Sequence, residues 1–209
     1  MKKIIFFITT ILVLISCKKE KTETPIDMTG EKVVKSVNNV IKKRDLPLKN
    51  FSKIEIVSYY NRMVWDTTTV NGKHSFNKIL VDNYKLTFDS TMIQERVILN
   101  KIQEKELLNL IISDTCNTGE TPADCYKPRH MILFRDSKNR IVGYNEFCIS
   151  CAYGRNSSNL DGFQKYCYSD MDRLFKKFGI KLFVEEGDED VEAENKEYDF
   201  LKHKGYIKN

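Results

Sequence analysis

Two strand-forming segments joined by a short polar turn constrain the fold of this chain most strongly. Arg129 to Arg135 and Arg140 to Cys148 are rich in apolar and aromatic residues, and Asp136-Ser137-Lys138-Asn139 stands between them. Asn139 is well suited to the left-handed backbone conformation that a hairpin turn requires. The sequence therefore predicts an antiparallel hairpin over residues 129–148.

The register of this hairpin decides which side chains share a face of the sheet. If Phe134 lies opposite Val142, then His130 lies opposite Glu146, because antiparallel partners keep a constant sum of residue numbers. Cys148 is then diagonal to His130 on the same face. A one-residue bulge would shift this register and exchange the two faces.

Further strands are predicted before the hairpin. Residues 51–60 alternate in the manner of a strand, and shorter strand signals at 76–81, 84–88 and 92–99 are separated by turn-forming residues. An antiparallel meander is the simplest arrangement of these segments.

Two or three helices are predicted to cover the sheet. Asn100 with Gln103 forms a capping-box pattern before apolar residues at helical spacing, which predicts a helix to about Ser113. A second helix is predicted to begin at Ser169 and to stop at Gly179, and residues 31–43 form a third, shorter candidate. The predicted fold class is α+β, an antiparallel β-sheet (meander plus hairpin 129–148) packed by two or three helices.

Residues 1–16 have the features of a lipoprotein signal peptide. Lys2 and Lys3 precede an apolar run that is too short to span a bilayer and that ends in Leu14-Ile15-Ser16-Cys17. Cleavage before Cys17 makes it the first residue of the mature chain, where its thiol takes a diacylglyceryl group and its amine an acyl chain such as palmitate. Each buried methylene contributes about 0.8 kcal/mol, so several chains anchor the protein firmly in the lipid bilayer.

The rest of the chain divides into a tether, one domain and an acidic end. Residues 17–30 are predicted to be a lipidated, flexible tether, 31–184 a single globular domain, and 185–209 an acidic and largely flexible tail. Nine acidic residues lie between positions 185 and 199, whereas the whole chain has a formal net charge of +5. The lysines are dispersed and no nucleic-acid-binding motif accompanies them, so we do not expect a nucleic-acid partner.

Disulfide bonds are the first interpretation of the cysteines in an exported chain. Cys116 with Cys125 would close a short loop, and Cys148 would pair with Cys151, or one of these two with Cys167. Besides Cys17 the chain has five cysteines, an odd number, so one of them remains outside intrachain pairs. The sequence does not choose the connectivity.

A structural zinc site is the alternative interpretation. Cys125 and His130 form one pair of ligands and Cys148 with Cys151 the other, and the hairpin brings both pairs to the same end. With all four positions occupied by protein, such a site is structural and not catalytic. Glu146 would orient the His130 ring from outside the ligand sphere.

Thiol–disulfide exchange at Cys148 and Cys151 is a third possibility. A reactive cysteine needs a helix start or a nearby cation, whereas residues 152–159 are predicted to be a loop in which only Arg155 is cationic. The sequence contains no phosphate-binding loop or nucleophile elbow. We therefore expect a non-enzymatic protein without a cofactor, with zinc as the alternative.

Two parts of the sequence resemble known groups of proteins. Ile15-Ser16-Cys17-Lys18-Lys19-Glu20 resembles lipoprotein leaders of the Bacteroidota, and no aspartate follows Cys17, which points toward the outer membrane. Residues 125–151 resemble a family of bacterial lipoproteins of unknown activity that have C-x-x-P-R-H, a hairpin and C-x-x-C. The resemblance implies that one pattern contains Cys125, Pro128, Arg129, His130, Cys148 and Cys151.

These features together predict a membrane-anchored lipoprotein of the cell envelope with a binding or structural role. The family resemblance transfers no activity, and it implies that Cys116 and Cys167 are particular to this chain. The side of the membrane that the protein faces stays open at this point.

Overall fold

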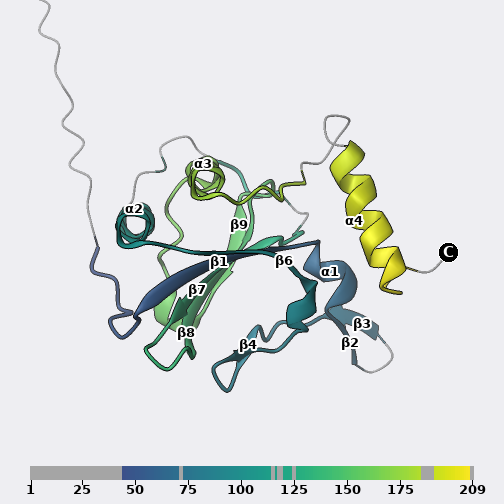
Figure 1. Cartoon of the computed structure of the whole chain (residues 1–209), viewed down its shortest axis with the longest axis horizontal. Helices are drawn as coiled ribbons and strands as arrows, with labels where there is room; N and C mark the ends of the chain where they lie inside the picture. The colour runs from purple at the N-terminus through teal and green to yellow at the C-terminus, as the bar shows by residue number, and fades with distance from the viewer. Residues whose placement is uncertain are drawn as a thin grey trace, which may run out of the picture. The chain divides into compact units, whose positions relative to one another are not determined.

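A five-stranded antiparallel sheet forms the centre of the protein (Figure 1). The computed structural model describes residues 44–70, 73–113, 116, 120–123, 126–184 and 191–207. The strand order is β6-β1-β7-β8-β9. The strands are β1 (Lys53–Tyr59), β6 (Ile93–Ile98), β7 (His130–Arg135), β8 (Ile141–Cys148) and β9 (Tyr153–Asn156). The predicted α+β fold class is confirmed.

The chain between β1 and β6 forms two small hairpins beside the main sheet. β2 (Thr67–Val70) pairs with β3 (Lys73–Phe76), and β4 (Val81–Asp82) pairs with β5 (Lys85–Leu86). The predicted meander is therefore wrong for the segments between β1 and β6, which do not join the main sheet. β1 pairs directly with β6 on one side and with β7 on the other. A short helix, α1 (Arg62–Trp65), follows β1 and precedes β2.

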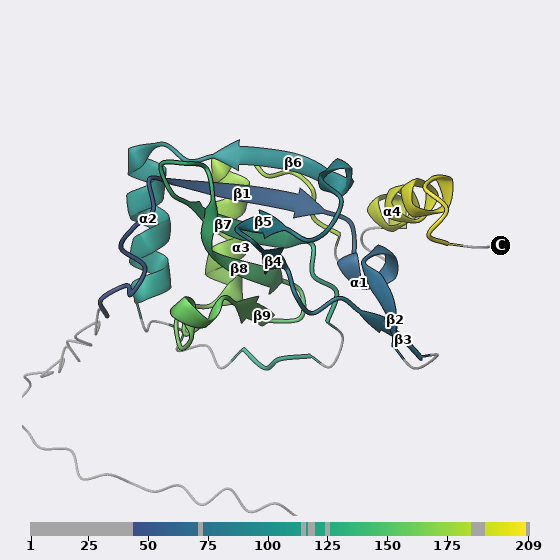
Figure 2. The same cartoon turned by 90° about the horizontal axis from the view of Figure 1, so that it is seen from below.

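Two helices cover one face of the sheet (Figure 2). α2 (Lys101–Ile112) begins at the predicted capping box, in which the Asn100 side chain accepts from the backbone N–H of Gln103 and the Gln103 side chain accepts from that of Asn100. α3 (Tyr168–Phe178) ends at Gly179, whose φ of 103° is the left-handed conformation that favours glycine. The predicted start at Ser169 is wrong, because Cys167 is the N-cap residue of α3.

The main apolar core lies between this face and the two helices. Ile54 and Ile56 of β1 and Phe134 of β7 are fully buried there, together with Phe147 of β8 and Phe175 of α3. Full burial of one such side chain stabilises the fold by about 1.5–3 kcal/mol relative to leaving it exposed. This core explains why the helices predicted from apolar spacing form on this side.

A second core covers the opposite face of the sheet. Val57 and Tyr59 of β1 and Leu133 of β7 pack there against the β1–β6 connection and the C-terminal helix. The residues that close this side include Trp65, Leu80, Phe88, Met92 and Leu201. Both faces of the central strands are therefore buried.

The acidic end of the chain contains a helix, α4 (Val191–His203). The prediction of a largely flexible tail is wrong for this segment, because Leu201 is buried in the second core and Glu197 is buried against Arg129. Residues 185–190, in which five of the nine acids fall, lie outside the described residues. Composition alone did not reveal that Leu201, Phe200 and Glu197 dock the helix.

The register of the β7–β8 hairpin differs from the predicted one by one residue. His130 pairs with Phe147 and Met131 with Glu146, because a bulge between Phe134 and Arg135 shifts the alignment. Glu146 therefore lies on the face opposite to His130. The turn itself is as predicted, since Asn139 has a φ of 64°.

Several predictions concern residues that the structure does not describe. The signal peptide 1–16, Cys17, the tether 17–30 and the candidate helix 31–43 all lie outside the described residues. Among the helices that are described, none has the length and apolarity to cross a membrane. The segment 152–159, predicted to be a loop, contains the edge strand β9.

Candidate functional site

Four of the cysteines form two disulfide bonds. Cys116 is bonded to Cys167, and Cys148 is bonded to Cys151. The prediction of disulfide bonds is confirmed, and so is the Cys148–Cys151 pairing that it offered. The suggested pairing of Cys116 with Cys125 is wrong, because Cys116 has Cys167 as its partner. Cys125 lies outside the described residues.

The Cys148–Cys151 disulfide closes the turn between β8 and β9. Its two cysteines are 1% and 0% exposed. The backbone N–H of Lys127 donates to the Cys148 sulfur at 3.4 Å, and that of Ala123 donates to the Cys151 carbonyl at 2.9 Å. The disulfide therefore packs against the segment that precedes β7, which contacts it at Ala123 and at Lys127.

The described members of the predicted zinc site do not converge. His130 has its Nε2 at 2.8 Å from the Leu182 carbonyl and its ring against Phe183 and Phe175 of the α3 side. Strand alternation directs Cys148 to the other face of β8, and its sulfur is bonded to Cys151. A zinc site with these ligands would need the Cys148–Cys151 disulfide to be reduced and the His130 ring to move to the face of the sheet on which Cys148 lies.

Glu146 does not orient His130, because the bulge reverses its face. Its carboxylate is 0% exposed and binds the Arg62 guanidinium at two points, Nε at 2.5 Å and Nη2 at 3.0 Å. The hydroxyls of Tyr59 and Tyr126 donate to the same carboxylate at 2.9 and 2.6 Å. Burial raises the pKa of both tyrosines, so they remain neutral donors. Four donors satisfy this carboxylate inside the fold.

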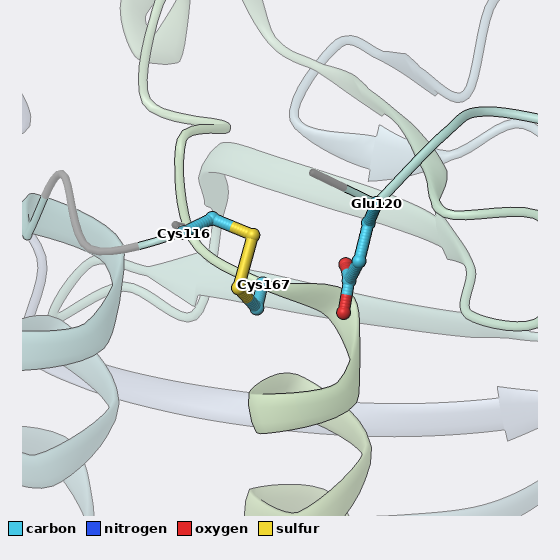
Figure 3. Close-up of side chains that lie close together, drawn as sticks. All are labelled: Cys116, Glu120 and Cys167. Carbon is cyan, nitrogen blue, oxygen red and sulfur yellow. A yellow bond between two sulfur atoms is a disulfide. The ribbon is translucent and has the colours of Figure 1, made fainter. Parts of the chain in front are cut away.

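A second cluster of potential ligands surrounds the other disulfide. Figure 3 shows the Glu120 carboxylate beside the bonded sulfurs of Cys116 and Cys167. One carboxylate oxygen and the two sulfurs lie within 4.8 Å of one another. The carboxylate accepts from the backbone N–H groups of Tyr168 and Ser169 at 2.6 and 3.1 Å. Burial raises the pKa of Glu120, but these bonds and one from the Ser169 hydroxyl outweigh it and lower the pKa overall. Glu120 therefore caps α3, and the paired sulfurs are not thiolate ligands.

A cavity of about 520 Å³ lies near the start of β7 and the N-terminus of α3. His130, Phe183 and Val184 line it, and its other lining residues include Lys127, Arg129, Ile149, Ser150, Tyr168, Ser169 and Asp172. His130 is 3% exposed, and its Nδ1 has no hydrogen-bond partner among the described residues. Burial lowers the pKa of His130 to about 4, so the ring is neutral near pH 7.

The charged residues that line this cavity have protein partners. Arg129 donates from Nε and Nη2 to Glu197 of α4 at 3.1 and 2.6 Å. Asp172 is paired with Lys176 at 2.9 Å. These groups are therefore held in place before any ligand arrives, which suits recognition more than proton transfer.

Sequence reasoning missed the residues that organise the second face. Arg62 and Glu197 are far from the hairpin in sequence, and each binds a hairpin residue across more than 60 positions. No spacing pattern links such distant charges. The only available signal was that a strand residue such as Glu146 must find a partner if both faces of its sheet are buried.

No family model, no curated protein and no solved structure matches this chain.

Proposed function

We propose that this chain is a lipid-anchored protein of the cell envelope, attached through an acylated Cys17, with a non-enzymatic binding or structural role. The observation that carries the proposal is that both cysteine pairs of the described residues are oxidised. Disulfides persist in exported proteins and are rare in a reducing cytosol. The oxidised cysteines therefore agree with the export signal that ends at Cys17.

The cavity beside His130 supports a binding role for the folded domain. Apolar side chains, among them Ile149 and Phe183, line it together with polar groups that are already held by protein partners. Ligand sites commonly combine such walls with a few fixed polar groups. The neutral ring of His130 forms part of the same wall.

The anchoring proposal is tested at the N-terminus. The mature protein is expected to begin at Cys17 with diacylglyceryl and acyl groups in its mass spectrum, and to sediment with membranes. Cys17→Ala should abolish the modification and release the protein. Ser16→Ala is the matched control, because it keeps a small residue before the cysteine and should leave processing intact. A wild-type protein that begins elsewhere and is soluble would overturn the anchor.

Metal analysis separates the disulfide interpretation from the zinc alternative. Protein isolated from an oxidising compartment is expected to show no reactive thiols at Cys148 and Cys151 and no bound metal. One zinc per chain, lost on His130→Ala and retained on His203→Ala, would favour the Cys125, His130, Cys148 and Cys151 site instead. His203 is the matched control because it is exposed on α4.

A further inference from the structure

The two disulfides occupy different surroundings. Cys148 and Cys151 are almost completely buried, whereas Cys116 is only partly buried. Cys116 also lines a cavity of about 500 Å³, together with Lys165 and Tyr166. Thiol–disulfide exchange requires an incoming thiolate to reach one sulfur in line with the bond. Access therefore favours reaction at the Cys116–Cys167 bond.

We propose that Cys116–Cys167 is a thiol–disulfide exchange site for a dithiol partner, and that Cys148–Cys151 is a structural disulfide. This reverses the assignment that the Cys-x-x-Cys spacing suggests. The inference rests on the proposed export only for its oxidising surroundings. The exchange reaction itself does not depend on the lipid anchor, so the two proposals fail in different experiments.

The position of Cys167 makes it the better leaving group of the pair. Cys167 is the N-cap residue of α3, and its carbonyl accepts from the backbone N–H groups of Asp170 and Met171 at 3.1 and 3.2 Å. The N-terminus of a helix has a partial positive charge that stabilises a nearby thiolate. A thiolate with a lowered pKa leaves faster.

Glu120 opposes this effect and so regulates the site. Its carboxylate lies within 4.8 Å of both sulfurs, and it binds the N–H groups of Tyr168 and Ser169 that a Cys167 thiolate would otherwise approach (Figure 3). A negative charge at this distance disfavours formation of a second one. Glu120 thus keeps the disulfide closed until a reductant with sufficient driving force arrives.

The exchange balances as a two-electron transfer from a dithiol. One thiolate of the partner attacks the Cys116 sulfur, the bond to Cys167 breaks, and its electron pair leaves with the Cys167 sulfur, which takes a proton from water. The second thiolate of the partner then attacks the mixed disulfide and releases Cys116 as a thiolate. The partner becomes a disulfide, and Cys116 and Cys167 are both reduced.

The cavity beside Cys116 offers a contact for such a partner. Tyr166 lines it and is 2% exposed, yet its hydroxyl oxygen has no hydrogen-bond partner in the part of the chain that the structure describes. Lys165 lines the same cavity, and its backbone carbonyl accepts from the N–H of Cys116 at 3.3 Å. A thiol-containing peptide segment in this cavity would bring a thiolate to Cys116.

Timed reduction of the oxidised full chain tests the proposal, with dithiothreitol as the probe. Iodoacetamide stops the reaction and peptide masses locate the free thiols. Cys116 and Cys167 are expected to open at least about tenfold faster than Cys148 and Cys151, because access of the thiolate controls the rate. Equal rates, or earlier opening of Cys148–Cys151, would overturn the proposal. Opening of both pairs together would do the same, since it indicates reduction through unfolding.

Two further measurements examine the direction of attack and the role of Glu120. Brief treatment with glutathione is expected to leave its mixed disulfide on Cys116, and trapping on Cys167 would overturn the assigned roles. Glu120→Gln should accelerate reduction about threefold or more, since it removes the opposing charge. Glu106→Gln, at a partly exposed position of α2 whose carboxylate pairs with Lys177, is the matched control and should leave the rate unchanged. An unchanged rate in Glu120→Gln would remove Glu120 from the proposal.

Discussion

An apolar core covers each face of the central sheet, but the second face also contains a buried ion pair. On the α2–α3 side, Ile56 and Phe134 meet other apolar side chains. On the opposite side, Glu146 forms a buried ion pair with Arg62 that two tyrosine hydroxyls complete. Apolar contacts depend only on the volume and shape of the side chains, whereas the Glu146–Arg62 pair requires each donor to meet its acceptor.

The buried ion pair explains why the bulge in the hairpin matters. An apolar side chain accepts many neighbours, but a buried carboxylate without donors costs several kcal/mol. In the register without the bulge, Glu146 would point into the apolar core beside Phe175, away from Arg62. The buried charges therefore make the observed register much more favourable than a one-residue slip.

The largest expected effect comes from breaking the ion pair on one side. Arg62→Met should lower the free energy of unfolding by about 3–5 kcal/mol, because it leaves the Glu146 charge buried without its cation. Urea unfolding followed by circular dichroism measures the change. Arg62→Met combined with Glu146→Leu should regain most of the loss. A single variant that costs less than about 1 kcal/mol would contradict a buried, coupled pair.

A second prediction concerns acid stability on the apolar face. Burial lowers the pKa of His130 to about 4, below the value near 6.5 expected in the unfolded chain. The unfolded state thus binds a proton more readily than the folded state. The contribution of neutral His130 to the free energy of unfolding is therefore complete above about pH 6.5 and is lost as the pH falls toward 4. The expected loss is about 3 kcal/mol between pH 7 and pH 4.

Unfolding curves at several pH values measure this dependence. His130→Gln should flatten it between pH 4 and 6.5, whereas His203→Gln, which changes an exposed residue of α4, should leave it in place. An unaltered slope in His130→Gln would assign the acid sensitivity to other groups.

The smallest effect on stability is expected where Glu197 of α4 contacts the second face of the sheet. Glu197 accepts two bonds from Arg129 and one from the backbone N–H of Asn61. Glu197→Gln should therefore destabilise the docked helix by about 1–3 kcal/mol. Hydrogen exchange of the α4 amides is the measurement, and they should lose protection before the amides of β1 and β7. Glu194→Gln, an exposed position on the same helix, is the control. Equal protection in both variants would show that the apolar contacts of Leu201 and Phe200 dock α4 without Glu197.

Local signals in the sequence predicted much of the fold. The capping box at Asn100, the stop at Gly179 and the left-handed Asn139 each depend on neighbouring residues only, and each is present. The prediction was poorer where distant contacts compete with local ones. The bulge at Phe134 changed the hairpin register, and strand pairing between β1 and β6 displaced the intervening segments into hairpins.

The candidate sites follow the same division. The sequence predicted disulfide bonds, because their formation depends on whether the compartment is oxidising. It could not predict that Cys116 pairs with Cys167. These two cysteines are 51 positions apart. The zinc arrangement needed His130 and Cys148 on one face, and a shift of one residue separates them, because side chains in a strand alternate.

By itself, the sequence determined the α+β class, the start of α2 at its capping box, the end of α3 at Gly179, and the presence of disulfides. These depend on short-range periodicity, backbone preferences and chemistry that few neighbouring residues define. Only the tertiary structure decided the register of the hairpin, the partners of Glu146 and Cys116, and the docking of α4 through Glu197. The physical reason is that a buried charge or sulfur takes its partner from whichever segment the fold brings near, and that segment is distant in the chain.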